Sequence, residues 1–316
     1  MMRRSLRLAL ALAPSLAALA ACDGGVDSLP DSDPDGSVDT DPDGSVDADS
    51  DSDSDSDGDG LFEITFIDVG QGDAALFEMP DGAVILIDGG PNGAGNSAIV
   101  PLLWERDIET IDLMVLTHPH SDHCGGLDEV LALTDVAEIW ENGETRPSSS
   151  YQSFAEARDE EGAQILVAQT GLARQHGGVQ LTVLAADRGY PDENNDSIVI
   201  AFDFAGVRVL TTGDIEAEAQ ADLLDEQGGA LESEIVKVPH HGSWNLDDGF
   251  VSAVSGDFGV ISCGAGNDFG HPHDEALDAW LGVGTTLCRT DQSGDVGVRI
   301  TADGQIERGC LYPIEP

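Results

Sequence analysis

The sequence predicts an α/β domain of the αββα type, in which two β-sheets pack face to face and helices cover their outer surfaces. Strand-like runs alternate with helix-like runs from residue 61 onward, and glycine-bearing turns separate the first three strands. The strands fall into two groups, one ending near residue 140 and the other beginning near residue 179. Two strand-rich halves with interspersed helices are typical of two sheets around a shared core.

Each element is assigned from its hydrophobic pattern and its turn residues. The first half is expected to contain, in order, strands at 61–69, 74–79 and 83–88, a helix at 96–106, a buried strand at 111–118, a helix after Gly126 and a strand at 136–140. The second half is expected to contain strands at 179–186, 196–204 and 207–214, a helix at 215–227, a strand at 234–241, a helix, a strand at 257–264, a helix from Pro272 and a strand at 284–290. The polar segment 142–163 gives no clear pattern.

The first 21 residues have the features of a bacterial secretory signal. Arg3, Arg4 and Arg7 precede an apolar stretch, and the sequence LAAC that ends at Cys22 resembles a lipoprotein cleavage motif. We therefore expect residues 1–21 to be removed and Cys22 to be lipidated, which makes the mature protein an exported lipoprotein anchored to a membrane of the cell envelope. No other apolar run approaches the ~20 residues that a membrane span needs. An ordinary signal peptide followed by a chance cysteine is the alternative.

Residues 22–60 consist almost entirely of Asp, Ser, Gly and Pro, and the sequence DPDGSVD occurs twice. This segment has too few apolar side chains to form a core and its like charges repel, so we expect a disordered acidic linker. Asp53, Asp55, Asp57 and Gly58 match the opening of an EF-hand calcium loop, but Ile64 stands where the last ligand belongs. The mismatch favours a solvated linker.

Residues 61–316 are numerous enough for one sizeable domain, and this domain is acidic. Outside the leader and the linker, 46 acidic side chains stand against 10 Lys and Arg. A groove that binds long nucleic acid normally carries positive charge. The balance therefore disfavours tight binding of long DNA.

Four cysteines lie in the domain, Cys124, Cys263, Cys288 and Cys310, and none has CxxC spacing. In an exported protein some of them can form disulfides. We expect Cys288 to pair with Cys310, and we interpret Cys124 as a packing residue.

A dense cluster of metal-ligand residues lies at the end of the strand expected at 111–118. Of eight histidines in the chain, three occur together with an aspartate in HPHSDH, as His118, His120, Asp122 and His123. Alternation along an extended backbone points His118, His120 and Asp122 the same way, and the turn brings His123 round from the other side. Imidazole nitrogen and carboxylate oxygen suit divalent ions such as Zn²⁺, so the cluster predicts the beginning of two adjacent metal sites.

Two further motifs close apolar strands in the second half. TTGD ends with Asp214, and VPHHGS contains His240, His241 and Ser243. Each motif places ligand-type side chains at the end of a strand, as the first motif does. Asp214 is suited to bridge two metals, and one histidine of the 240/241 pair would complete the second site. The sequence leaves open which of the two it is.

Together these motifs make the sequence similar to metallo-β-lactamase-fold hydrolases, and among them to the hydrolase domain of ComEC-type competence proteins. The matching segments are, in order, FIDVGQGDA (66–74), ILIDGG (85–90), LTHPHSDHCGG (116–126), NNDSIVI (194–200), TTGD (211–214), VKVPHHGS (236–243), FGHPH (269–273) and RTDQSG (289–294). The resemblance covers the hydrolase only and leaves out the membrane channel and DNA-binding parts of a competence protein. The resemblance therefore does not imply a role in DNA uptake for this protein.

The resemblance implies an αββα fold with two divalent ions, usually zinc with manganese as another candidate, between the sheet edges. Carried over residue by residue, it implies one ion bound by His118 and His120, a second bound by Asp122, His123 and one of His240 and His241, and Asp214 as a bridge between them. Asp122 and Asp214 are accordingly the carboxylates expected to take part in catalysis.

One position departs from the wider family, many members of which supply a third histidine to the first ion. This sequence has Asn194-Asn195-Asp196-Ser197 there, so the first site is expected to be more open. A strand-end carboxylate can fix a ligating histidine through the far ring nitrogen. The residues expected to support the ligands or contact substrate are Asp68, Asp73, Asp88, Asn194, Asn195, Ser243 and His271.

The expected function is that of an exported metal-dependent hydrolase, and the resemblance favours a phosphodiesterase that uses metal-activated hydroxide. Its expected substrate is a small phosphodiester or an ester on a cell-envelope polymer rather than long nucleic acid. Two alternatives remain open: hydrolysis of a carboxylic ester, lactone or β-lactam by the same fold, and a non-catalytic metal-binding surface module.

Overall fold

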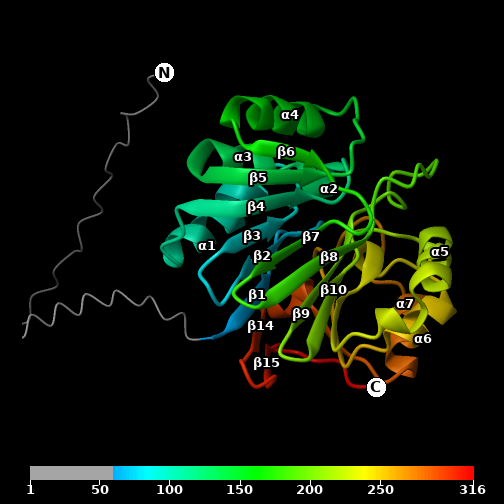
Figure 1. The fold of residues 1–316 in the computed structure, drawn as a ribbon. Helices are drawn as coiled ribbons and strands as arrows, with labels where there is room; N and C mark the ends of the chain where they lie inside the picture. Colours follow the sequence, from blue (N-terminus) through cyan, green and yellow to red (C-terminus); the bar gives the residue numbers. More distant parts are fainter. Residues whose placement is uncertain (1–59) are drawn as a thin grey trace, which may run out of the picture. The chain divides into compact units, whose positions relative to one another are not determined.

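The computed structural model describes residues 60–316, and these residues form the two-sheet sandwich seen in Figure 1. Within them, the first sheet has eight strands in the order β15-β14-β1-β2-β3-β4-β5-β6, and the second has seven in the order β13-β12-β11-β10-β9-β8-β7. The expected leader, Cys22 and nearly all of the expected linker lie outside the described residues.

The elements have the following bounds. The first sheet comprises β1 (Phe62–Phe66), β2 (Ala75–Glu78), β3 (Val84–Ile87), β4 (Thr110–Leu116), β5 (Asp135–Glu141), β6 (Gln164–Val167), β14 (Val296–Ile300) and β15 (Ile306–Gly309). The second comprises β7 (Ala173–His176), β8 (Val179–Ala185), β9 (Val199–Phe204), β10 (Val207–Thr211), β11 (Ile235–Lys237), β12 (Phe258–Ile261) and β13 (Thr286–Arg289). The α-helices are α1 (Val100–Glu105), α2 (Ser121–Cys124), α3 (Leu127–Leu133), α4 (Ser149–Glu161), α5 (Ala217–Gln227), α6 (Asp248–Val254), α7 (Asp274–Gly282) and α8 (Thr290–Ser293).

The central strands bury both faces, and successive side chains enter different cores. In β4, Leu113 and Val115 pack into the core between the two sheets, whereas Met114 and Leu116 pack beneath the helices. Because side chains alternate along a strand, an unbroken apolar run serves both layers. This explains why the unbroken apolar run at 111–118 predicts a buried strand.

The helices lie on the outer faces of the two sheets. α3 and α4 pack on the first sheet through side chains such as Val130 and Phe154. α6 and α7 pack on the second through Phe250 and Trp280. The layers therefore follow the order helix, sheet, sheet, helix, which confirms the αββα fold predicted from the sequence. None of the helices within residues 60–316 is long and apolar enough to cross a bilayer.

Helix α4 (Ser149–Glu161) lies within the segment 142–163, to which the sequence pattern gave no assignment. It begins after Ser148, whose side chain accepts a hydrogen bond from Tyr151 N, and it ends at Gly162 with a φ of 83°. A serine N-cap and a left-handed glycine after the last turn are the signals that mark such a helix. The apolar face of α4 is weak, so the hydrophobic pattern alone does not predict this helix.

Strands β6, β7, β14 and β15 are also absent from the elements expected from the sequence. The chain returns after the second sheet and adds β14 antiparallel to β1, with Val298 opposite Ile64. β15 then pairs antiparallel with β14. The pairing of β14 with β1 joins residues more than two hundred positions apart, whereas β14 and β15 form a local hairpin.

The expected disulfide between Cys288 and Cys310 is present. Cys288 lies in β13 of the second sheet and Cys310 directly follows β15 of the first, so the bond ties the two sheets together. Cys124 and Cys263 are buried free thiols. Burial and the charge of Asp88 raise the pKa of Cys124 to about 12, so this thiol packs rather than reacts near neutral pH.

Candidate metal centre

The candidate ligands lie in loops that follow parallel strands. β3, β4 and β5 are parallel in the first sheet, and β10, β11 and β12 are parallel in the second. In open α/β sheets the carboxyl ends of such strands are where ligand sites form. The loops after these strand ends carry Asp88, the HPHSDH motif, Asp214 and the His240–His241 pair.

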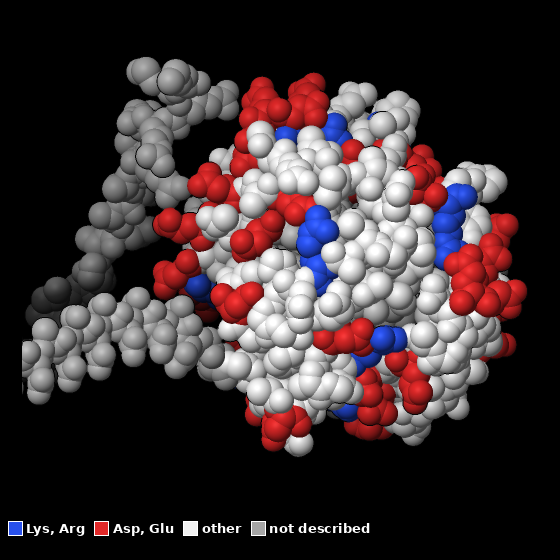
Figure 2. All heavy atoms as spheres, in the orientation of Figure 1, with Lys and Arg blue, Asp and Glu red and all other residues white. Residues whose placement is uncertain are grey.

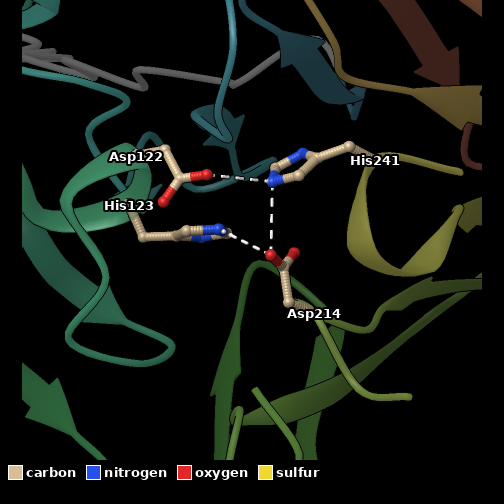
Figure 3. A group of neighbouring side chains, drawn as sticks. All are labelled: Asp122, His123, Asp214 and His241. Atoms are coloured by element: carbon tan, nitrogen blue, oxygen red, sulfur yellow. Dashed lines mark hydrogen bonds and ion pairs between the residues drawn. The ribbon is translucent and has the colours of Figure 1, made fainter. Parts of the chain in front are cut away.

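Four side chains from three segments of the chain converge, as Figure 3 shows: Asp122 and His123 from α2, Asp214, and His241. Their ligand atoms all lie within 4.8 Å of one another. His123 Nε2 is 3.1 Å and His241 Nε2 is 3.2 Å from Asp214 Oδ2, and His241 Nε2 is 3.4 Å from Asp122 Oδ2. All but Asp122, which is half-buried, are buried. We refer to these four residues as the four-ligand cluster.

The polar atoms at this place fit a divalent ion. His241 Nε2, Asp214 Oδ1 and His118 Nε2 are buried and make no hydrogen bond. Buried polar atoms without partners are rare in folded proteins, and a bound ion is one way in which such atoms are satisfied. Imidazole nitrogen combined with carboxylate oxygen is a donor set that suits zinc and manganese.

Asp88 orients His123 from behind. Its Oδ2 lies 2.8 Å from His123 Nδ1, and its two oxygens also accept hydrogen bonds from the backbone N–H and hydroxyl of Thr117. With Nδ1 engaged in this way, Nε2 of His123 faces Asp214. This is the contact expected of a strand-end carboxylate.

Asp73 and the loop before it brace the other side of the cluster. Asp73 Oδ1 lies 3.2 Å from His241 Nδ1, which is also 2.9 Å from the carbonyl oxygen of Ser262. The backbone N–H of Asp73 donates to the carbonyl of Asp122. At Gly72, with a φ of 143°, a Cβ atom would lie 2.2 Å from that same carbonyl, so only glycine allows this approach.

His118 and His120 lie beside the four-ligand cluster rather than in it. Their rings are 4.6 Å apart, and His118 Nδ1 lies 3.2 Å from the hydroxyls of Thr117 and Ser197. Burial, followed by the charge of His123, lowers the pKa of His118 well below its ordinary value. His118 is therefore a neutral imidazole, the form that binds metals.

The structure distinguishes His241 from His240. Both residues have left-handed backbone angles, with φ values of 54° and 46°, a strained conformation for side-chain-bearing residues. The turn sends His241 into the four-ligand cluster. His240 instead has Nδ1 3.1 Å from Glu216 Oε1, and its Nε2 is 3.8 Å from Asp214 Oδ2.

Lys237, to which sequence reasoning assigned no role, lies beneath the cluster. It is the single lysine of the chain and is buried, with Nζ in contact with Asp73 Oδ2 and 3.5 Å from Asp214 Oδ1. Burial opposes its charge, but Asp73 and Asp214 outweigh burial and raise the pKa of Lys237. The feature of the sequence that could have indicated this role is a lysine inside an otherwise apolar strand.

The charges of this network also act on Asp214. Burial alone would raise its pKa, but His123, His241 and Lys237 hold the pKa of Asp214 well below its ordinary value. Asp214 is therefore an ionised, buried carboxylate, available as a ligand.

The cluster opens onto a cavity of about 680 Å³, which is within the usual range for small-molecule sites. Asp122 and Asp214 line it, as do the exposed aromatic side chains of Trp244 and Phe269. His271 also lines it and has a buried Nδ1 without a hydrogen-bond partner. Burial, followed by the charge of His241, lowers the pKa of His271 to about 4.

Of the other residues expected to support the ligands or contact substrate, some line the cavity and others do not. Asn194 and Ser243 line the cavity. Asn195 is buried, and its Oδ1 accepts a hydrogen bond from Glu216 N. Asp68 is exposed, and its carboxylate accepts from Gly70 N rather than contacting a ligand histidine.

The family model of the metallo-beta-lactamase superfamily matches residues 67–248, a range that includes every member of the four-ligand cluster. The chain belongs to the metallo-beta-lactamase superfamily. Its membership, its fold and its cluster of histidines and aspartates identify a metal-dependent hydrolase.

Within the superfamily, the chain is similar to competence proteins. ComE operon protein 3 of Bacillus subtilis (strain 168) is 27% identical over 255 residues, which cover 75% of this chain and 33% of that protein. Competence protein ComA of Neisseria gonorrhoeae is 31% identical over 233 residues, which cover 73% of this chain and 31% of that protein. The chain thus spans about a third of the length of these relatives.

A solved structure supports the fold. The metallo-beta-lactamase fold protein YhfI from Bacillus subtilis is similar with a TM-score of 0.50 at 12% identity, over 78% of this chain and 100% of that one. At this identity the likeness concerns the fold alone.

Proposed function

We propose that this chain is an exported metallo-hydrolase that cleaves small phosphodiesters. The observation that carries the proposal is the convergence of Asp122, His123, Asp214 and His241 at one side of a cavity of about 680 Å³. The similarity to competence proteins favours phosphodiesters over other esters, although their role in competence is not transferred to a chain that spans about a third of their length.

In this proposal the cluster holds one divalent ion, and His118 and His120 hold a second together with Asp214. Zinc suits this donor set best, with manganese as the alternative. Ions bound there would supply hydroxide near neutral pH and neutralise charge on phosphoryl oxygens.

The side chains of the chain itself would orient the ester. A phosphodiester offers two non-bridging oxygens, and the cavity offers polar groups beside the cluster. His271 Nδ1 is buried without a partner in the cavity wall, and a neutral imidazole can donate one hydrogen bond. Ser243 and Asn194 lie in the same wall and add a hydroxyl and an amide.

The charge of the domain favours a small substrate. Outside the leader and linker, 46 acidic side chains face 10 Lys and Arg, and red acidic surface exceeds blue basic surface on the face in Figure 2. Such a surface repels a long polyanion but penalises a single phosphodiester far less. A zwitterionic choline ester on a cell-envelope polymer would be repelled least.

We expect the purified full-length chain, supplied with Zn²⁺ or Mn²⁺, to hydrolyse bis(p-nitrophenyl) phosphate and small phosphodiesters and to act more weakly on duplex DNA. Release of p-nitrophenol and gel assays of DNA cleavage measure the two activities. Robust turnover of a lactone or β-lactam with no turnover of any phosphodiester would overturn the proposal in favour of the alternative hydrolase. Bound metal without turnover of any ester would favour a non-catalytic module.

We further propose that the protein is anchored to a membrane of the cell envelope through a lipid on Cys22. The change Cys22→Ser should release the protein from the membrane fraction or leave an uncleaved precursor, because the lipid cannot be attached. Fractionation of cells followed by mass measurement of the N-terminal fragment tests this expectation. Equal membrane partitioning of both proteins, each with the same processed N-terminus, would contradict it.

A further inference from the structure

His120 is the expected ligand whose orientation depends on a residue that the sequence motifs do not include. Its Nε2 lies 2.9 Å from Glu193 Oε2. The two side chains are partly exposed, at 24% and 31%, and His120 lines the cavity. Glu193 directly precedes the segment 194–197, where many family members carry an additional histidine ligand.

The other expected ligand histidines each engage one ring nitrogen with a protein group. His123 and His241 use Nδ1 for Asp88 and a backbone carbonyl, and His118 has Nδ1 beside two hydroxyls. All three leave Nε2 toward the site. His120 differs, because its protein partner, Glu193, contacts Nε2. The ring nitrogen of His120 that remains free to bind an ion is therefore Nδ1.

The surroundings of Glu193 favour a supporting role over a role as ligand. The same Oε2 atom that faces His120 is also in contact with Nη1 of Arg146. A guanidinium beside this oxygen would repel a divalent ion bound to it. A carboxylate held in place by this guanidinium can still accept a hydrogen bond from an imidazole N–H.

We propose that Glu193, held by Arg146, is the positioning residue that directs Nδ1 of His120 toward the ion at His118. The inference rests on the metal-dependent part of the proposed function and is independent of which ester is cleaved. It implies two unequal sites. Three of the four side chains in the four-ligand cluster are buried, whereas the His118–His120 site depends on a partly exposed contact.

Titration of the metal-free full-length chain with Zn²⁺ and with Mn²⁺ in a calorimeter tests this inference. We expect two binding steps, of which the weaker belongs to the His118–His120 site. We expect Glu193→Gln and Glu193→Ala to lower the metal affinity of this weaker step by about 10- to 100-fold, the usual effect of removing a residue that supports a ligand. The tighter step should keep its affinity. A merely structural role would alter both steps or neither.

Glu216→Gln is the matched control, because Glu216 is a carboxylate of the same cavity whose Oε1 lies 3.1 Å from Nδ1 of His240, outside the four-ligand cluster. It should leave both binding steps unchanged. The inference is overturned if the Glu193 variants keep both affinities, if they lose the two steps equally, or if Glu216→Gln weakens the same step as strongly. Because no substrate is used, a failure here is distinguishable from a failure of the phosphodiesterase proposal.

Discussion

Replacing Asp214 with alanine should abolish hydrolysis and reduce the metal content of the protein. Asp214 Oδ2 lies within 3.2 Å of His123 Nε2 and His241 Nε2, and Asp214 is the expected bridge between the two ions. Its loss removes a ligand from both sites, so we expect activity to fall by more than the 10- to 100-fold typical of changes behind a ligand. Elemental analysis and turnover of bis(p-nitrophenyl) phosphate measure the two effects.

Loss of a ligand must be separated from loss of the fold. Asp214→Asn retains the shape of the side chain but removes its charge, and circular dichroism shows whether each variant is folded. Asp248→Ala, which removes an exposed carboxylate at the start of α6, is the matched control and should retain metal and activity. A folded Asp214→Ala protein that still binds two ions and turns over at the original rate would rule out the assigned site.

The candidate ligands could be found from the sequence because each lies in a short motif at the end of an apolar strand. Asp122, Asp214 and His241 are far apart along the chain, yet each follows a strand of one of two parallel groups. Parallel strands bring such ends to one edge, so pattern and residue type together indicated the place. The αββα layers followed from the same strand runs.

Other features depend on backbone geometry that the sequence pattern does not encode. His240 and His241 are adjacent and carry the same side chain, and the turn with two successive left-handed φ angles determines which of them enters the four-ligand cluster. Asp68 and Asp73 lie in one glycine-rich loop, but Asp73 turns inward to His241 while Asp68 is exposed. The contact of Glu193 with His120 joins two loops and has no sequence signature.

The change Lys237→Met should destabilise the metal-free protein strongly. The ammonium group of Lys237 is buried against Asp73 and Asp214, two carboxylates that are themselves buried. Removing one partner from a buried charge network leaves uncompensated charge, and the usual cost is about 3–5 kcal/mol in the free energy of unfolding. Methionine fills a similar volume, so the loss reflects charge rather than a cavity.

Metal should reduce this loss, because a divalent ion supplies positive charge to the same carboxylates. Urea unfolding followed by circular dichroism, with and without Zn²⁺, measures the free energy of unfolding in both states. Arg299→Met, which removes a cation from an exposed pair with Glu63, is the control and should change that free energy by about 1 kcal/mol or less. The Lys237 variant should gain more free energy of unfolding from the ion than the unmodified protein does, since a more negative site binds the ion more tightly and ligand binding stabilises the folded state. A metal-free Lys237→Met protein as stable as the original would mean that Asp73 and Asp214 do not need this ammonium group, and that the charge network under the cluster has been misassigned.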